Sequence, residues 1–396
     1  MTPKTEFEYI VVGLGGLGAA ATYWLARRAG SEVLGLEQFE LGHANGASGD
    51  HSRIIRLSYH QPSYVALAQH AFDHWRRFER ETGEPLLVIT GDLLLGPRVS
   101  VMPITDYMES LATENVQFEH LDADEIMARW PQWRLDADIH ASFQPDGGIV
   151  PARKAILSLA SRAGDLGAII REHARVTAIV PLVGGVQVVT EEAVYRCRRL
   201  VLAVDAWTNQ LLAPLDLRLP LTLTQEQVSY FASARPEEFT PDRFPVWIWG
   251  DDPNFYGFPV FGEERAVKAA QDMSGRKIKL ESRTFEPDAA VVERIATFLR
   301  RHLPGAFGPV KYSKTCLYTL TPDRDFVVDT LPGYPQISLA LGAGHGFKFA
   351  ALIGRILCDL AVDDRTEYAI APFALDRDSL LRPEMPTSFL LRRSIA

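Results

Sequence analysis

The sequence predicts an α/β fold with α+β character, in which a Rossmann-like dinucleotide-binding domain carries a second domain built on a mixed sheet. Three observations lead to this prediction. A glycine-rich strand–turn–helix pattern lies near the amino terminus, a second one lies near the carboxyl terminus, and an aromatic, β-like stretch lies between them. The chain has 396 residues, which is long for one hydrophobic core, so two domains are expected.

The composition is that of an ordinary soluble globular protein, with 47% hydrophobic and 23% charged residues. The net charge of −9 argues against a nucleic-acid partner, because nucleic-acid-binding proteins are usually basic. Three scattered cysteines fit a reducing compartment, so we expect a cytoplasmic protein. The uncharged run 9–26 is long enough to suggest a membrane span, but its glycines and the acids that precede it argue against a membrane or export role.

The first predicted elements are a strand over Tyr9–Val12, a tight turn and a helix. Glycines at 13, 15 and 18 form the pattern G-x-G-x-x-G. Gly13 can adopt the turn conformation, Gly15 lets the backbone approach a pyrophosphate, and Gly18 lets the helix pack closely on the strand. The amino terminus of the helix would present free N–H groups and a positive dipole end to the phosphates.

A second strand is predicted at 32–36 and is followed by Glu37. An acid about 20 residues past the glycines can accept hydrogen bonds from ribose hydroxyls and disfavours NADP. The ordered pattern predicts dinucleotide binding but does not by itself separate NAD from FAD. The long polar stretch 45–56 favours FAD, since it is too elaborate for a simple NAD crossover. It ends with Arg53 and Arg56, which could neutralise an anion beside the cofactor ring or form surface salt bridges.

Two predicted strands, Leu200–Val204 and the aromatic stretch 246–262, occupy the middle of the chain. Most of the aromatic side chains are expected in the core of a sheet. Four of them would also suit a pocket for a bulky substrate, namely Trp247, Trp249, Phe255 and Phe258. Lys268 follows in an apolar segment, where it either faces outward from an alternating strand or has a partner or a task.

The second strand–turn–helix pattern comprises a strand over Ile337–Leu341, the turn G-A-G-H-G, and an amphipathic helix over Lys348–Leu360. Because similar units stand at both ends of the chain, we expect one nucleotide-binding domain assembled from both termini. Cys358 lies on the apolar face of this helix and is expected in the core. Cys316 has no cysteine nearby, so a zinc site or local disulfide is not expected. It could be a buried filler, a reactive nucleophile or an attachment point.

Taken together, these stretches resemble the D-amino-acid-oxidase superfamily of FAD-dependent oxidoreductases, and within it the monomeric sarcosine oxidase and N-methyltryptophan oxidase family. The motifs that carry the resemblance span nearly the whole chain: 13–18, Glu37, 52–56, 90–97, 255–262, 316–326 and 342–349. The resemblance implies a glutathione-reductase-like FAD/NAD(P)-binding architecture and a monomer. The FAD-binding domain would comprise residues 1–88, 151–217 and 322–396, and the substrate domain residues 89–150 and 218–321.

The resemblance also implies a role for each matching residue. Cys316 would carry FAD through a thioether to the 8α-methyl carbon. Arg56 and Lys348 would hold a substrate carboxylate, and Lys268 would promote the reduction of O₂ beside flavin N5. The remaining cofactor-binding positions are Gly13, Gly15, Gly18, Glu37, Ser52, Arg53, Gly344 and Gly346, and the pocket-lining positions are Tyr256, Tyr318 and Asp272. No metal is expected.

The reaction implied is the FAD-dependent oxidation of the C–N bond of a secondary, N-methyl or N-alkyl, amino acid to an imine, with O₂ reduced to H₂O₂. Asp272 and either Gly49 or Asp50 stand where sarcosine oxidases usually carry histidine, which argues against sarcosine itself more than against amine oxidation. A cyclic imino acid or a fructosyl amino acid is an alternative substrate. A flavin-binding partner protein without turnover is the alternative from another class.

Overall fold

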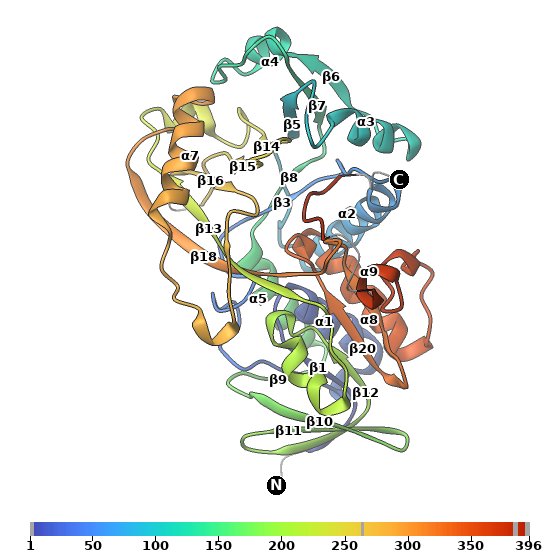
Figure 1. The fold of residues 1–396 in the computed structure, drawn as a ribbon. Helices are drawn as coiled ribbons and strands as arrows, with labels where there is room; N and C mark the ends of the chain where they lie inside the picture. The colour runs from blue at the N-terminus through green and yellow to red at the C-terminus, as the bar shows by residue number, and fades with distance from the viewer. Residues whose placement is uncertain (1–3, 263–264, 383–386, 393–396) are drawn as a thin grey trace.

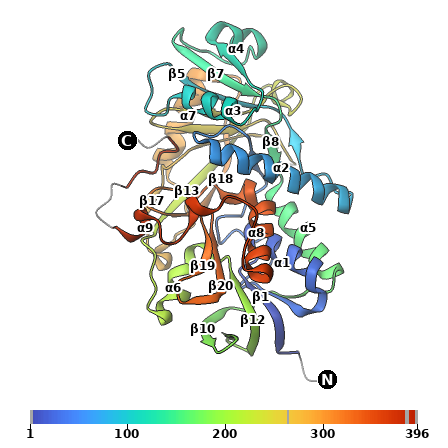
Figure 2. The same cartoon turned by 90° about the vertical axis from the view of Figure 1, so that its right-hand side faces the viewer.

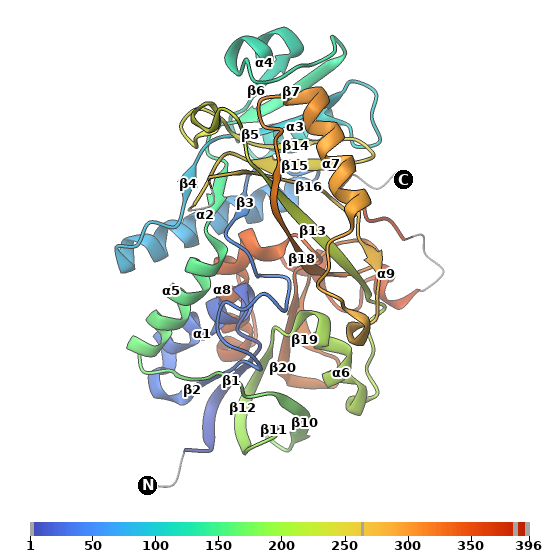
Figure 3. The ribbon, with the colours of Figure 1, turned by 90° about the vertical axis from the view of Figure 1, so that its left-hand side faces the viewer.

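The computed structural model describes residues 4–262, 265–382 and 387–392. Two large sheets dominate the molecule and lie one above the other in Figure 1. Helices cover one face of the lower sheet, and the upper sheet carries α7 (Ala289–His302) along its outer side (Figure 3). This arrangement confirms the predicted α/β fold with a second, mixed sheet.

The lower sheet has eight strands in the order β10-β11-β12-β1-β2-β9, with β20 paired to β12 and β19 paired to β20. β1, β2, β9, β12 and β20 run parallel where they pair, as expected for a dinucleotide-binding sheet. Strands from both ends of the chain therefore meet in one sheet. The bounds are β1 Glu6–Val12, β2 Val33–Leu36, β9 Ile169–Arg171, β10 Val176–Leu182, β11 Gly185–Thr190, β12 Val194–Leu202, β19 Val327–Leu331 and β20 Tyr334–Leu341.

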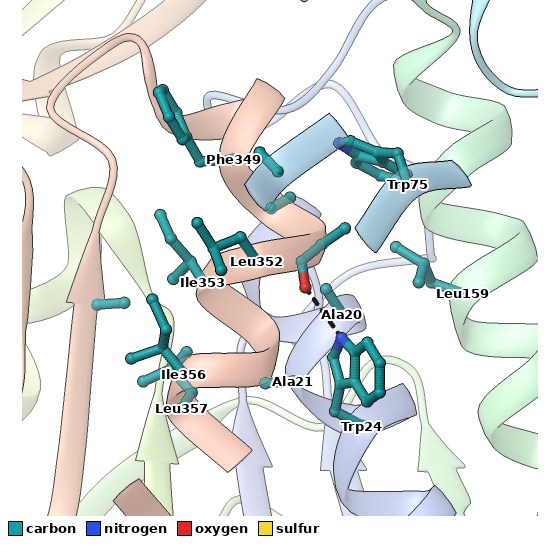
Figure 4. Packing of buried hydrophobic residues seen from close by; sticks show 14 of the residues in the cluster. Ala20, Ala21, Trp24, Trp75, Leu159, Phe349, Leu352, Ile353, Ile356 and Leu357 are labelled. Atoms are coloured by element: carbon teal, nitrogen blue, oxygen red, sulfur yellow. Dashed lines mark hydrogen bonds between the residues drawn. The ribbon is translucent and has the colours of Figure 1, made fainter. Parts of the chain in front are cut away.

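Helices α1 (Gly16–Ala29), α5 (Ala152–Asp165) and α8 (Ala350–Asp363) pack over this sheet, and α2 (Pro62–Thr82) packs on α8 (Figures 2 and 4). α1 and α8 come from opposite ends of the sequence, and a Cβ added to Gly354 of α8 would lie 2.5 Å from Ala20 of α1. The indole N–H of Trp24 donates a hydrogen bond to the backbone carbonyl of Ala351, 2.9 Å away. Cys358 is 1% exposed in this interface, which confirms its prediction as a core residue.

The upper sheet has nine strands in the order β17-β13-β16-β15-β14-β5-β7-β6, with β18 paired to β13. Its long antiparallel pair, β13 and β18, reaches down toward the lower sheet (Figure 1). The bounds are β5 Asp92–Pro97, β6 Glu119–Asp122, β7 Ile139–Gln144, β13 Thr222–Phe231, β14 Val246–Trp249, β15 Phe255–Phe258, β16 Val267–Gln271, β17 Arg276–Lys277 and β18 Val310–Leu320.

Smaller elements complete the fold. A three-stranded sheet lies between the two large ones and consists of β3 Arg53–Ile55, β8 Gly148–Val150 and β4 Val88–Ile89. The short helices are α3 Ile104–Thr113, α4 Ala123–Arg129, α6 Thr208–Leu212 and α9 Asp378–Leu381. Within the described ranges, no helix is both long enough and apolar enough to cross a bilayer.

Three of the four aromatic residues that would suit a pocket for a bulky substrate do not line the central cavity, so this prediction is wrong for Trp247, Trp249 and Phe255. Trp247, Trp249 and Phe255 pack against α7, and the ring of Phe298 lies 5.4, 5.2 and 4.4 Å from theirs. Side chains alternate between the two faces of a strand, so the intervening residues face the other way. Of the four, Phe258 alone lines the central cavity.

Candidate active site

A cavity of about 600 Å³ lies between the two large sheets, lined by residues of both. One end is formed by the glycine-rich turns that follow β1 and β20. The other end is formed by side chains from β15, β16 and β18 of the upper sheet. Such a volume between layers fits a buried organic cofactor together with a small substrate.

The first glycine turn is built from backbone and leaves no room for side chains. Gly13 has a φ of +84°, and an added Cβ would lie 2.6 Å from the carbonyl oxygen of Ala203. A Cβ on Gly18 would lie 1.7 Å from the carbonyl oxygen of Gly13, so Gly18 serves the close helix–strand contact and is not part of the cavity wall. Glu37 accepts a hydrogen bond from the N–H of Leu14 at 2.8 Å, which ties the second strand to this turn.

The second glycine turn packs against β18 and leads into the segment that carries Lys348. Gly344 has a φ of +80°, and the ring of Tyr318 lies 2.7 Å from where its Cβ would be. The ammonium of Lys348 donates to the carbonyl of His345 at 3.0 Å. The expected helix over Lys348–Leu360 begins later, because Gly346–Phe349 forms a 3₁₀ turn and α8 starts at Ala350.

Two cations, the buried Arg56 and the half-buried Lys348, lie beside one aromatic ring after this turn. The guanidinium carbon of Arg56 lies 4.8 Å from the centroid of the Tyr59 ring, and the ammonium of Lys348 lies 5.8 Å from the same centroid. Burial lowers the pKa of Lys348 well below its usual 10.5, and the neighbouring Arg56 and Arg324 lower it further. This pair has a strong preference for an anion, because a negative charge would relieve both the desolvation and the mutual repulsion.

Arg324 belongs to the same site, although the sequence reasoning missed it. Its guanidinium donates two hydrogen bonds to the carboxylate of Asp272, at 2.7 and 2.9 Å, and a third to the backbone carbonyl of Phe389 at 2.8 Å. Asp272 is therefore the partner of a buried arginine as well as a cavity-lining residue. The one available signal was the position of Arg324 in the segment T-P-D-R-D after Cys316.

Lys268 is 2% exposed and has partners, so the interpretation as an outward-facing lysine is wrong. Its ammonium lies 2.6 Å from Asp50 and donates to the backbone carbonyl of Ser52 at 2.9 Å. The side chains of β16 do alternate, with Val267 and Ala269 in the core that contains α7, but the opposite face, which carries Lys268, is covered by the loop of Asp50 and Ser52 at the cavity. Burial lowers the pKa of Lys268 to about 8, although the Asp50 carboxylate opposes this shift.

Arg53 is also held inside the molecule, not at the surface. Its guanidinium donates to three backbone carbonyls of the loop before β3, those of Ala47 at 2.8 Å, Gly49 at 2.6 Å and Ser52 at 2.9 Å. These bonds fold the polar stretch 45–56 around the guanidinium and bring it to the cavity wall.

Cys316 lies on β18, and its side chain lines the cavity. Burial raises the pKa of its thiol to about 11, while the positive charge of Arg53 acts in the opposite direction. The thiol is therefore protonated near neutral pH. Arg53 is the cation whose position favours the thiolate.

The cavity wall carries polar atoms that fit a bound dinucleotide. The buried atoms without a hydrogen-bond partner among the described residues include Nη1 of Arg56, Nδ1 of His345 and Oδ2 of Asp205. All three side chains line the cavity, which also has the two glycine turns at its base. Buried polar groups are rarely left without partners, so these atoms indicate a bound polar molecule.

The structure brings the predicted site residues together around one space. Of those named from the sequence, all line the cavity except Gly18 and Ser52, and Ser52 accepts the hydrogen bonds of Lys268 from outside the wall. The lining residues that the sequence reasoning missed include Arg324, Asp205, Tyr107 and Leu391, besides Asp50 as the partner of Lys268.

A cavity with glycine turns suited to a dinucleotide at one end and cations on its wall fits an FAD-dependent oxidoreductase. Residues 8–360 match the family described as FAD dependent oxidoreductase, and the chain belongs to this family. It is 32% identical over 383 residues to a monomeric sarcosine oxidase of Bacillus sp. (strain B-0618), covering 95% of this chain and 97% of that protein. It is 32% identical over 380 residues to the N-methyl-L-tryptophan oxidase of Escherichia coli (strain K12 / DH10B), covering 94% and 99%.

The chain is also similar in fold and sequence to a solved structure. NikD, described as an unusual amino acid oxidase essential for nikkomycin biosynthesis, superposes in its open form with a TM-score of 0.84 at 30% identity, covering 94% of this chain and 98% of that one. The membership confirms the resemblance drawn from the motifs and the dependence on FAD.

Proposed function

We propose that this protein oxidises a secondary amino acid, N-methylated or N-alkylated, to an imine with O₂ as the electron acceptor. The observation that carries the proposal is a pair of cations, the buried Arg56 and the half-buried Lys348, over the ring of Tyr59 on the wall of the cavity. FAD, held by the glycine turns after β1 and β20, would supply the redox chemistry, which is the two-electron oxidation of the amine and the reduction of O₂ to H₂O₂.

The cationic pair binds the substrate carboxylate. Arg56 offers a planar fork that matches a carboxylate, and Lys348 adds a point charge beside it. Since the pKa of Lys348 is well below its usual value in the absence of an anion, an arriving carboxylate raises it and fixes the proton on Nζ. This places the substrate's amine end toward Tyr256, Tyr318 and Lys268, which line the rest of the chamber.

Around the amine, this chain offers aromatic walls and few groups that could hold its proton. Burial raises the pKa of Tyr256 and of Tyr318 above the usual 10, so both stay protonated and act as hydrogen-bond donors. A poorly solvated chamber favours the neutral amine, the form from which a hydride can leave. We assign no general base. Lys268 is the fixed cation for the reaction of O₂.

FAD would be covalently attached through Cys316. The thiol reaches the cavity, and Cys197 and Cys358, the other two cysteines, lie buried in the cores of the lower half. Because only the thiolate attacks, attachment in the protein with FAD added should accelerate as pH rises toward 11. Acid precipitation tests the linkage: yellow colour stays in the pellet of the wild type and moves to the supernatant for Cys316→Ser. Colour in the wild-type supernatant would refute it.

The division into an FAD-binding domain (1–88, 151–217, 322–396) and a substrate domain (89–150, 218–321) fits this function. The cavity then lies at their boundary, the usual place for a ligand site in a two-domain protein. We further propose that the protein acts as a cytoplasmic monomer.

A peroxide assay over N-methyl amino acids, cyclic imino acids and fructosyl amino acids tests the activity. We expect turnover of an N-alkyl amino acid that keeps its carboxylate and none of the corresponding amine without it. Arg56→Lys should raise KM by about tenfold or more, because it loses the bidentate fork while keeping the charge. Arg129→Lys, which changes an exposed arginine outside the cavity, is the control. Oxygen consumption that is indifferent to the carboxylate would exclude this function.

A further inference from the structure

The ammonium of Lys268 is enclosed by a set of oxygens that the proposed function does not explain. Oδ2 of Asp50 lies 2.6 Å from its Nζ, and both the carbonyl and the hydroxyl oxygen of Ser52 accept from it, at 2.9 and 3.2 Å. Lys268 is 2% exposed, and the side chain of Asp50 is 5% exposed. The pair is therefore almost dry, where charge–charge interactions are strongest.

Asp50 is in turn held by the chain around it. The hydroxyl of Tyr230 on β13 donates to Oδ1 of Asp50 at 2.6 Å, and the guanidinium of Arg53 lies 3.8 Å from Oδ2. Asp50 also has a φ of +124°, a conformation that costs energy for a residue with a Cβ. Strain at a buried charged residue indicates that the fold positions this carboxylate for a purpose.

We propose that Asp50 is a positioning residue that sets the charge of Lys268: it holds the ammonium in place and keeps it protonated while masking part of its field. The inference rests on the proposed role of Lys268 in the reaction with O₂.

Burial and charge act on Lys268 in opposite directions. Desolvation lowers its pKa to about 8, and Asp50 is the largest influence that raises it, while Arg53 lowers it. Asp50 itself stays ionised, because Lys268 and Arg53 outweigh its burial and hold its pKa well below the usual value. The other titratable or charged groups near the pair are His51, Tyr230, Tyr256, Tyr312, Lys314 and Cys316.

The first test is the pH dependence of flavin reoxidation. Enzyme reduced without oxygen is mixed with O₂, and the rate constant is followed between pH 6 and 10. In the wild type the rate should fall as pH rises through about 8. In Asp50→Asn, which keeps the acceptor for Tyr230, the midpoint should fall by about one pH unit or more, making reoxidation about fivefold slower at pH 8. Asp50→Ser removes the same charge with a smaller side chain and replaces the Asn variant if that one does not fold. Asp50→Glu should restore the midpoint toward the wild type.

The second test measures binding, not turnover. Sulfite adds to oxidised flavin, and its dissociation constant follows from the loss of flavin absorbance. At pH 6, where Lys268 keeps its proton, Asp50→Asn should bind sulfite about tenfold more tightly, because the masking carboxylate is gone. A purely structural defect would weaken binding at every pH.

Lys268→Met separates the two hypotheses. If this variant reoxidises as fast as the wild type, the proposed role of Lys268 fails. If it is slow while Asp50→Asn has the wild-type midpoint and sulfite affinity, the role of Lys268 stands and the role of Asp50 is overturned.

Discussion

The ion pair between Asp272 and Arg324 offers a sharp test of how charge is balanced at the substrate end. The Arg324 side chain is 3% exposed and that of Asp272 13%, and two hydrogen bonds of 2.7 and 2.9 Å join them. Asp272→Leu leaves a buried guanidinium beside Arg56 and Lys348, with the Phe389 carbonyl still accepting from it. Breaking a buried pair in this way costs about 3–5 kcal/mol in the free energy of unfolding.

The double variant Asp272→Leu/Arg324→Met should be more stable than Asp272→Leu, since it removes both charges. Replacing a buried ion pair by apolar residues is often close to neutral. Thermal unfolding of the apoprotein is measured for the wild type, the two single variants and the double variant, which together form a double-mutant cycle. For a chain of this length, about 4 kcal/mol corresponds to a shift of roughly 5 °C in the unfolding temperature. Asp136→Asn is the control: its pair with Arg301 is more than 60% exposed on both sides, so the change should stay within about 0.5 kcal/mol. A coupling energy below about 1 kcal/mol for Asp272 and Arg324 would refute the reasoning.

The remaining predictions concern packing, pH and substrate size. Gly354→Val should destabilise the protein by about 2–4 kcal/mol, because its Cβ would collide with Ala20. Gly83→Ala should cost only about 1 kcal/mol, since nothing lies within 4 Å of its Cβ and the penalty comes from the positive φ of this position alone. Chemical denaturation measures the free energy of unfolding of both variants. Burial raises the pKa of Glu226 from 4.5 to about 7, so the folded state binds a proton that the unfolded state releases, and its stability falls as pH rises between these values. Glu226→Gln should remove this loss, so that between pH 4 and pH 8 its free energy of unfolding rises relative to that of the wild type by up to about 3 kcal/mol. If the free energies of unfolding of the variant and the wild type change equally with pH, the prediction is wrong. Leu391→Ala should enlarge the chamber near Tyr107 and lower KM for bulky N-alkyl amino acids relative to small ones, and an unchanged ratio would show that Leu391 does not limit substrate size.

The dinucleotide half of the site could be predicted because its constraints are local. The turn at Gly13, the contact at Gly18 and the placement of Glu37 each follow from backbone geometry within a few dozen residues, and the structure shows all three. The same holds for the second turn, where Gly344 has a positive φ. These positions leave a signal in the sequence because no other residue type satisfies the backbone at Gly13 and Gly344 without strain.

The substrate half depends on contacts between residues far apart in the chain, and single positions say little about them. Asp50 and Lys268 are 218 residues apart, and Asp272 and Arg324 are 52 apart, yet each pair is within hydrogen-bonding distance. Strand alternation misled in two ways: it allowed Lys268 to face outward, and it did not reveal which of Trp247 and Ile248 faces the cavity. Both questions depend on what packs on each face of the sheet, which is α7 on one face and the cavity on the other.

The charges around the cavity explain why the substrate should carry a negative charge at only one of its ends. At the carboxylate end, the buried carboxylate of Asp92 acts on both Arg56 and Lys348, but Nη1 of Arg56 has no hydrogen-bond partner among the described residues, and the carboxylate of Asp272 binds Arg324. At the other end, the carboxylate of Asp50 already partners Lys268, and the tyrosines there remain neutral. Near Lys268, a second carboxylate on the substrate would compete with Asp50, which pairs with Lys268 and lies 3.8 Å from Arg53 and 3.9 Å from Lys314. We therefore expect a monocarboxylate with an uncharged N-substituent to be preferred over a dicarboxylate of equal size, because only the first leaves the Asp50–Lys268 pair intact.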